Sequence, residues 1–344
     1  MGSLVPALLA LGEPLEIVAL GGRPELLPAG VAYQTEPRHP PTNAGWILAG
    51  LPQAARRARV DVIHAPAYTA PWWAPAPVVL SIHDVSYARH PEWYPYRRDP
   101  IRRMFYRRSA LVAAHILTMS TFSATEITAA YGIAPDRITV AHLGVDPRFS
   151  PSPGDPGPAG HGLPRPYVLH VGDLHERRNL ATVVDAVAAA RRAGGPAASL
   201  SLVLVGSDRG VWGALRTQAA AAGMTDAVVH LTSVSEDELV SLYRGAEALV
   251  YPSLYEGFGL PLIEAMAAGT PVLASRAACI PEVTGDAARL LDPLNTADWT
   301  TAIADVVGNS TRHAHMRKAG VARAATFTWE RTARLTWDVY RRVA

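Results

Sequence analysis

The sequence predicts an α/β protein of two domains, each a parallel β-sheet covered by helices on both faces. Short apolar segments alternate with alanine-rich segments of helical length in both halves of the 344 residues, a pattern typical of sheets buried on both sides. Residues 147–166 read PRFSPSPGDPGPAGHGLPRP, which is too rich in proline and glycine for a helix or a strand. This run separates two halves of ordinary domain size.

Strand and helix limits follow from the apolar runs and from capping signals. Strands are predicted at residues 16–20, 60–64, 78–82, 115–119 and 138–142 of the first half, and at residues 167–171, 200–205, 228–232, 248–251 and 271–274 of the second. Capping boxes predict helix starts at Ser123-x-x-Glu126 and at Ser235-x-x-Glu238. A last helical stretch is predicted after Trp329.

The domain organisation places the expected site. We predict domains at residues 1–150 and 167–326, a linker at 151–166 and a closing helix at 327–344. Two such domains leave a cleft between the carboxyl ends of their strands, where open parallel sheets bind ligands. The functional side chains are therefore expected in loops that follow strands.

The composition restricts the class of protein. Apolar residues make up 49% and charged residues 18%, so the chain can bury a large core. The net charge of +2 indicates no particular partner. A single cysteine, Cys279, excludes an internal disulfide and fits a reducing compartment. With no apolar run long enough to span a bilayer and no basic leader, we expect a cytoplasmic protein with at most peripheral membrane contact.

Residues 251–266, YPSLYEGFGLPLIEAM, predict an anion-binding loop. A strand ends at Tyr251, a glycine-containing loop follows, and a helix is predicted from Pro261 to about Gly269. The backbone groups of Phe258, Gly259 and Leu260 then lie at a helix N-terminus, where anions are favoured.

Two further features of this loop fit a ligand. Gly257 and Gly259 allow the backbone to approach a bound molecule closely, and Glu264 is expected in the first helical turn. An ordinary glycine-rich turn with no ligand is the alternative interpretation.

Seven residues separate Glu256 from Glu264 within the string EGFGLPLIE. This E-x7-E pair, with its glycines and proline, resembles the signature of retaining glycosyltransferases of the family-4 type (glycosyl transferases group 1). Their GT-B fold has two Rossmann-like domains facing across a cleft. The resemblance implies that Glu256 lies beside the transferred sugar and that Glu264 binds the donor ribose.

The loop at residues 171–180, VGDLHERRNL, is similar to the V-G-x-x-x-x-R-K-N-L loop of the same family. The resemblance implies that Gly172 lies at the donor and that Arg178 grips its diphosphate in place of the usual lysine. Many relatives carry an arginine directly after the glycine; Asp173 stands there, and Arg177 is the candidate to compensate. Two arginines on a surface loop are the alternative.

Two other strand ends of the second half resemble nucleotide-lining positions of the family. They are Gly206, at the end of LVLVGS, and Val234, at the end of HLTSV, where the backbone is expected to contact the base. Both signals are weak alone, because a glycine after a strand is common in α/β proteins.

In the first half, the segment SIHDVSY at residues 81–87, followed by HPEW, resembles the family's T-I-H-D-L-S-Y segment. The resemblance implies that His83 faces the sugar or the reaction centre and that Asp84 orients it. A histidine with a purely structural hydrogen bond is the alternative. Relatives begin with a strand and a glycine-rich loop before the helix that residues 4–11 represent, so the first strand of the domain is expected to be missing.

The resemblance implies transfer of a sugar, mannose or another hexose, from a nucleotide-diphosphate donor with retention of the anomeric configuration. Because Arg178 and the helix N-terminus would hold the leaving diphosphate, we expect no metal and no other cofactor. A catalytically silent nucleotide-sugar-binding relative, or an epimerase or hydrolase of the same fold, is the alternative.

The acceptor is expected to be a glycan, a lipid-linked sugar or a small molecule. The segment Arg97–Arg108 holds six arginines among aromatic residues. It is interpreted either as a solvated basic helix face or as a surface for an acidic membrane or a phosphorylated lipid acceptor. Nucleic acid is not expected as a partner, because no matching fold motif is present.

Overall fold

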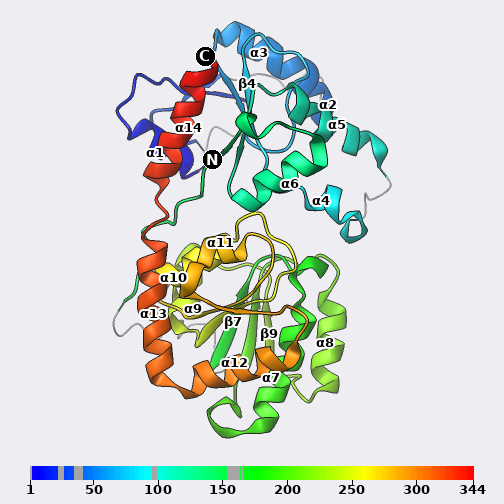
Figure 1. Cartoon of the computed structure of the whole chain (residues 1–344), viewed down its shortest axis with the longest axis vertical. Coiled ribbons are helices and arrows are strands. Elements are labelled where there is room, and N and C mark those ends of the chain that lie inside the picture. The colour runs from blue at the N-terminus through cyan, green and yellow to red at the C-terminus, as the bar shows by residue number, and fades with distance from the viewer. Residues whose placement is uncertain (1, 22–26, 35–41, 95–98, 153–162, 164–165) are drawn as a thin grey trace. The chain divides into compact units, whose positions relative to one another are not determined.

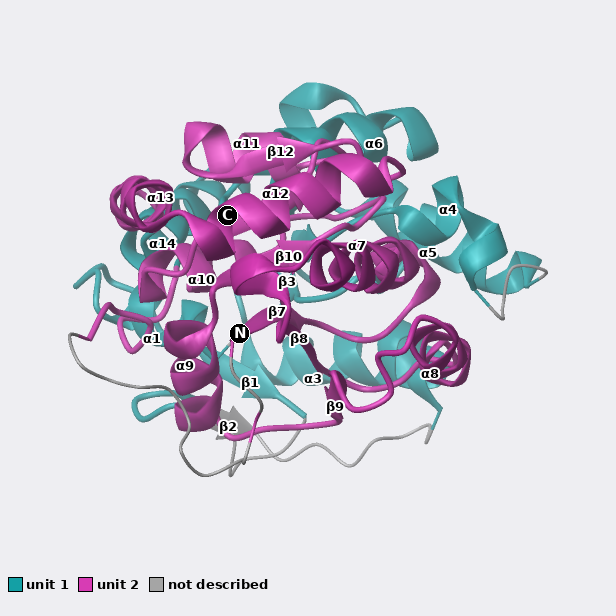
Figure 2. Cartoon of the chain, turned by 90° about the horizontal axis from the view of Figure 1, so that it is seen from below, with its two compact units in different colours: residues 1–144, 328–344 teal, residues 145–327 magenta. Residues whose placement is uncertain are grey.

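The computed structural model describes residues 2–21, 27–34, 42–94, 99–152, 163 and 166–344. The chain forms two compact units, shown in different colours in Figure 2. Unit 1 comprises Met1–Gly144 together with Thr328–Ala344, and unit 2 comprises Val145–Phe327. Most of the predicted linker, residues 153–162 and 164–165, lies outside the described residues.

Unit 2 contains a six-stranded parallel sheet in the order β12-β11-β10-β7-β8-β9. Its strands are β7 (Tyr167–Val171), β8 (Ser201–Val205), β9 (Val228–Leu231), β10 (Ala248–Tyr251), β11 (Val272–Ser275) and β12 (Arg289–Leu291). The chain builds outward from β7 to β9 on one side, then returns to β10 and builds to β12 on the other. β7 and β10 are therefore neighbours at the point where the order reverses, and open α/β sheets bind ligands beside the carboxyl ends of such strands.

Helices cover both faces of this sheet (Figure 1). They are α7 (Leu180–Ala193), α8 (Trp212–Ala221), α9 (Glu236–Gly245), α10 (Leu260–Ala268), α11 (Ile280–Thr284), α12 (Thr296–Gly308) and α13 (Ser310–Ala324). On one face, Val183 of α7 and Ile303 of α12 share a buried cluster with Leu204 of β8. On the other, the Tyr167 hydroxyl of β7 donates a hydrogen bond to the Leu242 carbonyl of α9, 2.8 Å away. Continuously apolar strands are buried on both sides as a result.

Unit 1 contains a four-stranded parallel sheet in the order β3-β4-β5-β6 and a separate parallel pair, β1 with β2. Its strands are β1 (Val18–Leu20), β2 (Ala32–Gln34), β3 (Ile63–Ala65), β4 (Val78–Ser81), β5 (His115–Thr118) and β6 (Ile138–Val140). Its helices are α1 (Leu4–Leu9), α2 (Asn43–Gly45), the π-helical turn Trp46–Gly50, α3 (Leu51–Ala58), α4 (Ser86–Arg89), α5 (Pro100–Val112), α6 (Thr121–Tyr131) and α14 (Trp329–Val343).

The C-terminal helix α14 completes the core of unit 1. Successive residues of a strand point to opposite faces, so Leu80 of β4 packs with α5 and α6 while Val79 packs with Val339 of α14. The Thr332 hydroxyl donates to the His142 carbonyl, 2.6 Å away, and this hydrogen bond ties the start of α14 to the segment that follows β6. Without these last residues, one face of the sheet would lie open to solvent.

The α/β class and the two Rossmann-like units are confirmed, whereas the expected cleft between them stays a prediction. The predicted strands of unit 2 agree with the observed ones within a residue or so, and α14 begins at Trp329 as expected. Two three-residue strands, β2 and β12, were not predicted, because their apolar runs are too short to stand out. The first described helix is α1, at Leu4–Leu9.

One predicted helix start is confirmed and one is wrong. Ser235 and Glu238 form the capping box of α9. The box at Ser123 does not form: α6 begins one turn earlier, with Ser120 as its N-cap, and the Ser120 hydroxyl accepts the Ser123 amide at 3.0 Å. The earlier serine takes the capping role, which leaves Glu126 free to pair with Arg89 at 2.8 Å.

Candidate active site

In unit 2, two loops meet beside the carboxyl ends of β7 and β10. The loop after β7 contains Arg177, whose carbonyl accepts the Leu254 amide at 2.8 Å. The Arg177 guanidinium donates in return to the Tyr255 carbonyl at 2.9 Å. The two loops named by separate sequence motifs are thus fastened into one structure, because the sheet order makes β7 and β10 neighbours.

Arg178 points into this junction and is only 8% exposed. Asn179, with a left-handed φ of 52°, turns the chain from the short 3-10 helix Glu176–Arg178 into α7. The Arg178 guanidinium pairs with the Glu256 carboxylate, donates to the Tyr251 hydroxyl, and stands 5.3 Å from the centre of the Tyr251 ring. Burial lowers the pKa of Arg178, and the neighbouring Tyr251 opposes that change.

Glu256 is the carboxylate that both arginines share. It is 4% exposed and receives Arg178 on one oxygen and Arg177 on the other, the latter at 3.2 Å. The sequence suggested a sugar-side glutamate and a diphosphate clamp as separate parts, and the structure brings them into direct contact. Two guanidinium groups against one carboxylate leave a net positive charge, and the Arg178 Nε–H has no hydrogen-bond partner among the described residues. Such a cluster can accept a further anion.

Two glycines make the junction sterically possible. Gly172 has φ +136°, and a side chain there would place its first carbon 3.2 Å from the Arg178 guanidinium. Gly206, at the end of β8, has φ +142°, and a first side-chain carbon would lie 2.3 Å from the Gly172 carbonyl oxygen. At Gly206 the close backbone contact excludes any side chain, whereas at Gly172 the positive φ and the nearby Arg178 guanidinium disfavour one.

The predicted anion loop leads into α10 through Gly259, the N-cap, whose φ is +86°. Phe258 is 2% exposed and packs edge-on against Phe327, with ring centres 5.8 Å apart. The side chain of Phe258 thus anchors the loop. The predicted contact of an anion with the backbone from Gly257 to Leu260 stays a prediction. The helix begins at Leu260, one residue before the predicted Pro261.

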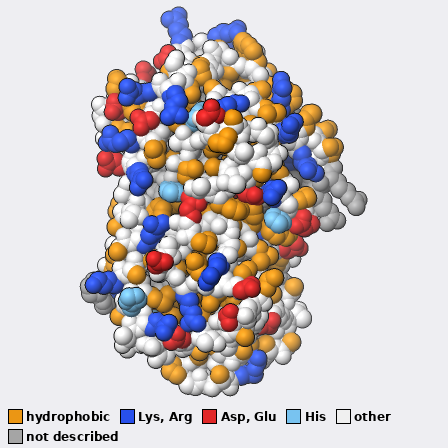
Figure 3. Space-filling view, viewed as in Figure 1, with side chains coloured by type: hydrophobic (Ala, Val, Ile, Leu, Met, Phe, Trp, Pro, Cys, Tyr) orange, Lys and Arg blue, Asp and Glu red, His pale blue; other side chains and the backbone are white. Residues whose placement is uncertain are grey.

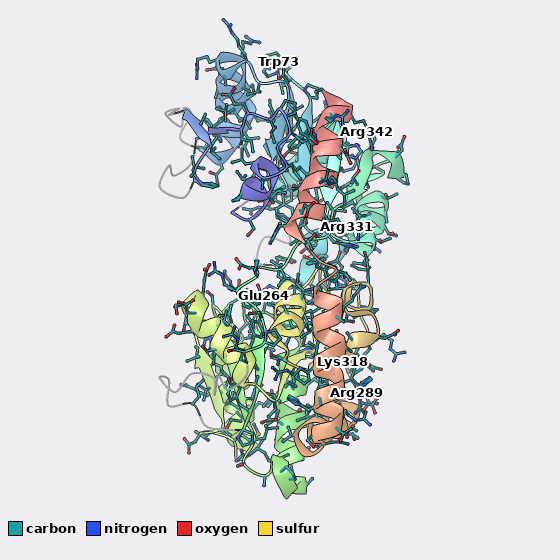
Figure 4. All side chains as sticks on the ribbon, turned by 90° about the vertical axis from the view of Figure 1, so that its left-hand side faces the viewer. Trp73, Glu264, Arg289, Lys318, Arg331 and Arg342 are labelled. Carbon is teal, nitrogen blue, oxygen red and sulfur yellow. The ribbon has the colours of Figure 1, made fainter. Side chains whose placement is uncertain are left out.

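Glu264 lies on α10, as Figure 4 shows, but in its second turn. The expectation of a first-turn carboxylate is wrong, because α10 starts at Leu260 and Glu264 is its fifth residue. The Tyr243 hydroxyl donates to the Glu264 carboxylate at 2.8 Å. Burial raises the pKa of Glu264, and the Tyr243 hydrogen bond opposes this change. Because this half-buried carboxylate accepts one hydrogen bond from the protein, its remaining lone pairs can accept another from a ligand hydroxyl.

Beyond β8 and β9, the structure adds residues that sequence reasoning missed. Asp173 stands where the resemblance led us to expect an arginine, and it is paired with Arg209 at 2.8 Å, so a guanidinium still lies beside the loop after β7. His230 bonds the Gly206 carbonyl through Nε2 at 2.7 Å and packs 4.8 Å from the Trp212 ring. The only sequence signal for Arg209 was its position, three residues after the strand-ending Gly206.

Val234, the last predicted donor residue of unit 2, is half-buried in the loop after β9. That loop shares the carboxyl edge of the sheet with the loops after β7 and β8. Its predicted backbone contact with a base stays a prediction.

In unit 1, His83 and Asp84 follow β4. His83 is half-buried, its buried Nδ1 has no hydrogen-bond partner among the described residues, and its ring packs edge-on against Tyr68 at 5.5 Å. Burial lowers the pKa of His83, and the Asp84 charge partly offsets this. The Asp84 carboxylate accepts the Ser86 amide at 2.9 Å and the Ser86 hydroxyl at 2.6 Å, and so holds the first residue of α4. The influence of Asp84 on His83 is electrostatic, and its predicted orienting role stays a prediction.

Around this histidine, unit 1 gathers hydroxyl and aromatic groups that the motif did not reveal. Tyr68 follows β3 with an unusual left-handed φ of 56°. Its ring lies 6.1 Å from that of Tyr87, whose hydroxyl bonds that of Tyr131. The Ser86 hydroxyl also contacts that of Tyr94. A strained non-glycine backbone beside a candidate residue is common at binding sites.

The described residues offer neither a metal-binding cluster nor a membrane-spanning helix. No group of three or more His, Cys, Asp or Glu residues among them is arranged to hold a metal ion. No helix within the described ranges has both the length and the apolar character needed to cross a bilayer.

Comparison with known protein families gives two matches that divide the chain. Residues 1–149 match the model for Glycosyltransferase Family 4, and residues 156–323 match the model for Glycosyl transferases group 1.

Two curated relatives are similar over most of their length. The chain is 30% identical over 271 residues to the O-antigen chain mannosyltransferase B of Escherichia coli, covering 76% of this chain and 70% of that protein. It is 30% identical over an alignment of 358 positions to the MMP alpha-(1->4)-mannosyltransferase of Mycolicibacterium hassiacum, covering 95% and 80%.

Solved structures share the fold at lower sequence identity. Sucrose-phosphate synthase from Thermosynechococcus elongatus matches with a TM-score of 0.76 and 22% identity, covering 98% of this chain and 91% of that one. Anabaena HepE in complex with UDP and glucose matches with a TM-score of 0.71 and 19% identity, covering 91% and 86%.

Proposed function

This chain belongs to the group 1 glycosyltransferases of the GT-B fold, and on that premise we propose that it moves a hexose from a nucleotide-diphosphate sugar to an acceptor with retention of the anomeric configuration. The observation that carries the proposal is the cluster of Arg177, Arg178 and Glu256 beside β7 and β10. It joins an anion-binding group to a carboxylate at the position where open parallel sheets bind ligands.

The donor diphosphate would bind where Arg178 now pairs with Glu256. A diphosphate carries more charge than one carboxylate and offers several acceptor oxygens, so it competes effectively for a guanidinium. The unpartnered Nε–H of Arg178 and the N-terminus of α10 add donors for it. Glu256, released from Arg178 but still held by Arg177, would then stay beside the sugar.

The remaining donor groups follow from the same placement. Glu264, anchored by Tyr243, would bind the ribose hydroxyls. Gly206 and Val234 would line the base, and Gly172 allows Arg178 to reach the phosphates. HepE was solved with UDP, which supports a nucleoside diphosphate as the leaving group, and the names of both curated relatives support mannose as the sugar.

Retention needs leaving-group departure and acceptor attack on the same face of the sugar. The transition state would resemble an oxocarbenium ion, which the Glu256 charge stabilises while Arg178 stabilises the departing diphosphate. A glycosidase would instead place two carboxylates about the scissile bond, and Glu256 and Glu264 are proposed to bind different parts of the donor. His83 would contact the sugar, with Asp84 orienting it. No metal is required in this scheme.

The acceptor would be a glycan, a lipid-linked sugar or a small molecule. The arginine-rich segment Arg97–Arg108 would bring the enzyme to membranes that carry a lipid-linked acceptor, working from the cytoplasmic side.

A thermal-shift screen of nucleoside mono- and diphosphates and their sugars tests the donor proposal. The matching nucleoside diphosphate at 100 times its dissociation constant should add about 2.7 kcal/mol of stability, and its monophosphate less. NMR of the product formed from the matching donor should show the donor's anomeric configuration. An inverted product would overturn the mechanism, and binding without turnover with every acceptor would identify a silent relative.

A further inference from the structure

Helix α5 of unit 1 exposes large apolar side chains. Ile101 is 71% exposed and Met104 is 54% exposed, although both sit on a regular helix. The opposite side of α5 is buried: Ala110 packs in the core, and the Ser109 hydroxyl donates to the Ala70 carbonyl at 3.2 Å. Spaced by three residues, Ile101 and Met104 lie on the same outward side of the helix.

Exposed arginines flank these apolar residues. Residues 100–112 read PIRRMFYRRSALV, with four arginines and no carboxylate. Arg102 pairs with the N-cap residue Asp99 at 3.5 Å. Within the described part of the chain, no ion pair involves Arg103, Arg107 or Arg108, which are exposed. We call Ile101, Arg103, Met104, Arg107 and Arg108 the α5 outer face.

An exposed tryptophan follows a residue that packs on α5. Trp72 packs on Phe105 of α5, with ring centres 5.2 Å apart, and its neighbour Trp73 is 59% exposed. The Arg56 guanidinium covers one side of the Trp73 ring at 5.0 Å. Figure 4 labels Trp73 on unit 1, and Figure 3 shows basic and apolar side chains interleaved where α5 lies in Figure 1.

We propose that the α5 outer face docks the enzyme on a bilayer rich in anionic phospholipid. A surface of apolar side chains interspersed with arginines matches the bilayer interface. Its apolar side chains enter the boundary of the acyl chains, and its arginines bind the phosphate groups of the lipids. Tryptophan is likewise favoured at that depth. A nucleic acid would use the arginines but not Ile101 or Met104. The docking rests on the membrane recruitment proposed above for Arg97–Arg108 and specifies its surface and lipid, but it does not depend on the donor-site assignment.

Vesicle sedimentation of the full chain tests the docking. The chain should partition onto vesicles of phosphatidylcholine with one part in three phosphatidylglycerol, and much less onto pure phosphatidylcholine. Added salt should weaken the binding, because it screens the arginines. Failure to bind the anionic vesicles at low salt would overturn the proposal.

Two pairs of variants locate the binding. Arg107→Gln with Arg108→Gln should lower partitioning roughly 30-fold, from a contribution of about 1 kcal/mol per arginine near the surface. The matched control is Arg341→Gln with Arg342→Gln, an adjacent and likewise exposed pair on α14 of the same unit, which should leave partitioning unchanged. Equal losses in both doubles would show that net charge alone acts and would overturn the assignment to α5.

A third double, Ile101→Ser with Met104→Ser, separates insertion from charge. It should lower partitioning at least tenfold while keeping the salt dependence, since the arginines remain. If it has no effect, or if a duplex oligonucleotide competes with vesicles for the α5 outer face at equal charge concentration, the bilayer is the wrong partner. Nucleoside-diphosphate binding by each variant, measured in the same buffers, keeps a failure of docking distinct from a failure of the proposed function.

Discussion

The loops after β7 and β10 in unit 2 are held together by charge, whereas those after β3 and β4 in unit 1 are held by hydroxyl and aromatic contacts. Arg177, Arg178 and Glu256 form the first arrangement, with both arginines on one carboxylate. In the second, the ring of His83 packs on Tyr68, and the Asp84 carboxylate holds Ser86. Both lie at the carboxyl edge of a parallel sheet, yet only the unit 2 edge suits a diphosphate.

The contrast shows that the topology of the sheet determines where a site forms and that its side chains determine which ligand suits it. The same edge of the same kind of sheet becomes an anion site when arginines are buried there against too little negative charge. It suits a neutral, hydroxyl-rich molecule when it carries aromatic faces and an uncharged histidine. The comparison therefore supports the proposal that unit 2 binds the donor and that unit 1 contacts hydroxyls of the sugar or the acceptor.

Separating the units should give the largest effect. Unit 2 is continuous in sequence and has its own core, so residues 145–327 expressed alone should fold and bind the nucleoside diphosphate. Transfer should be abolished, because the groups of unit 1 are missing. Calorimetric titration and a transfer assay measure the two properties. A folded fragment that fails to bind would contradict the assignment of the donor to unit 2.

Glu256→Gln should come next, with kcat reduced by about 10²–10³-fold, the scale of losing one electrostatic stabiliser of a charged transition state. Nucleoside-diphosphate affinity should hold or rise, because Arg178 loses its competing partner. Steady-state kinetics with the matching donor measures both quantities. The exposed Glu330→Gln is the control, and an equal loss of kcat in both variants would remove Glu256 from the reaction.

Arg178→Ala should weaken nucleoside-diphosphate binding by about 10- to 150-fold, which corresponds to about 1.5–3 kcal/mol for a charged hydrogen bond. Arg178→Lys keeps the charge and should recover part of that loss. Titration calorimetry of both variants, with thermal melting as a check of folding, measures the difference. Unchanged diphosphate affinity in the alanine variant would exclude the clamp.

His83→Ala should lower kcat/KM for the acceptor by about tenfold, as for loss of one hydrogen bond of about 1.4 kcal/mol, and should leave nucleoside-diphosphate affinity unchanged. Because burial lowers the pKa of His83, its ring is neutral above pH 6.5, and no loss of activity caused by its titration is expected between pH 6.5 and 8. If His83→Ala bound the nucleoside diphosphate as poorly as Arg178→Ala does, the different roles of the sheet edges in unit 1 and unit 2 would be contradicted.

The smallest expected effect concerns stability: apart from the loss of the proposed ribose contact, Glu264→Gln should change the free energy of unfolding in a pH-dependent way. Burial raises the folded pKa of Glu264 above its ordinary value of 4.5, so the folded state holds its proton more tightly than the unfolded state. The protonated Glu264 therefore contributes to the free energy of unfolding at low pH, and this contribution is lost as pH rises from 4.5 through the folded pKa. Relative to the wild type, the Gln variant should gain stability between pH 4.5 and pH 7. Thermal melts across that range check the sign; a constant difference would contradict it.

The amino-acid sequence by itself determined the α/β class, the two-unit organisation, and the loops that carry the candidate groups. Periodicity and strand-ending glycines are local signals, so the sequence alone suffices to place residues such as Gly172 and Glu256 after strands. The family resemblance then supplied their expected roles. Helix starts were less certain, because Ser120 and Ser123 compete for one cap and only the packing of the turn selects between them.

The tertiary structure alone decided which of these loops touch. Nothing local makes β7 a neighbour of β10, since the two strands are separated by the whole of β8 and β9; the order of the sheet does so. The ion pairs of Arg178 and Arg177 with Glu256 follow from it, as does the pairing of Asp173 with Arg209. Burial is equally non-local: Val79 is covered because α14 returns from the end of the chain, whereas Met104 stays exposed because no described element covers it. Charge partners and exposure depend on contacts between distant segments, and these exist only once the chain has folded.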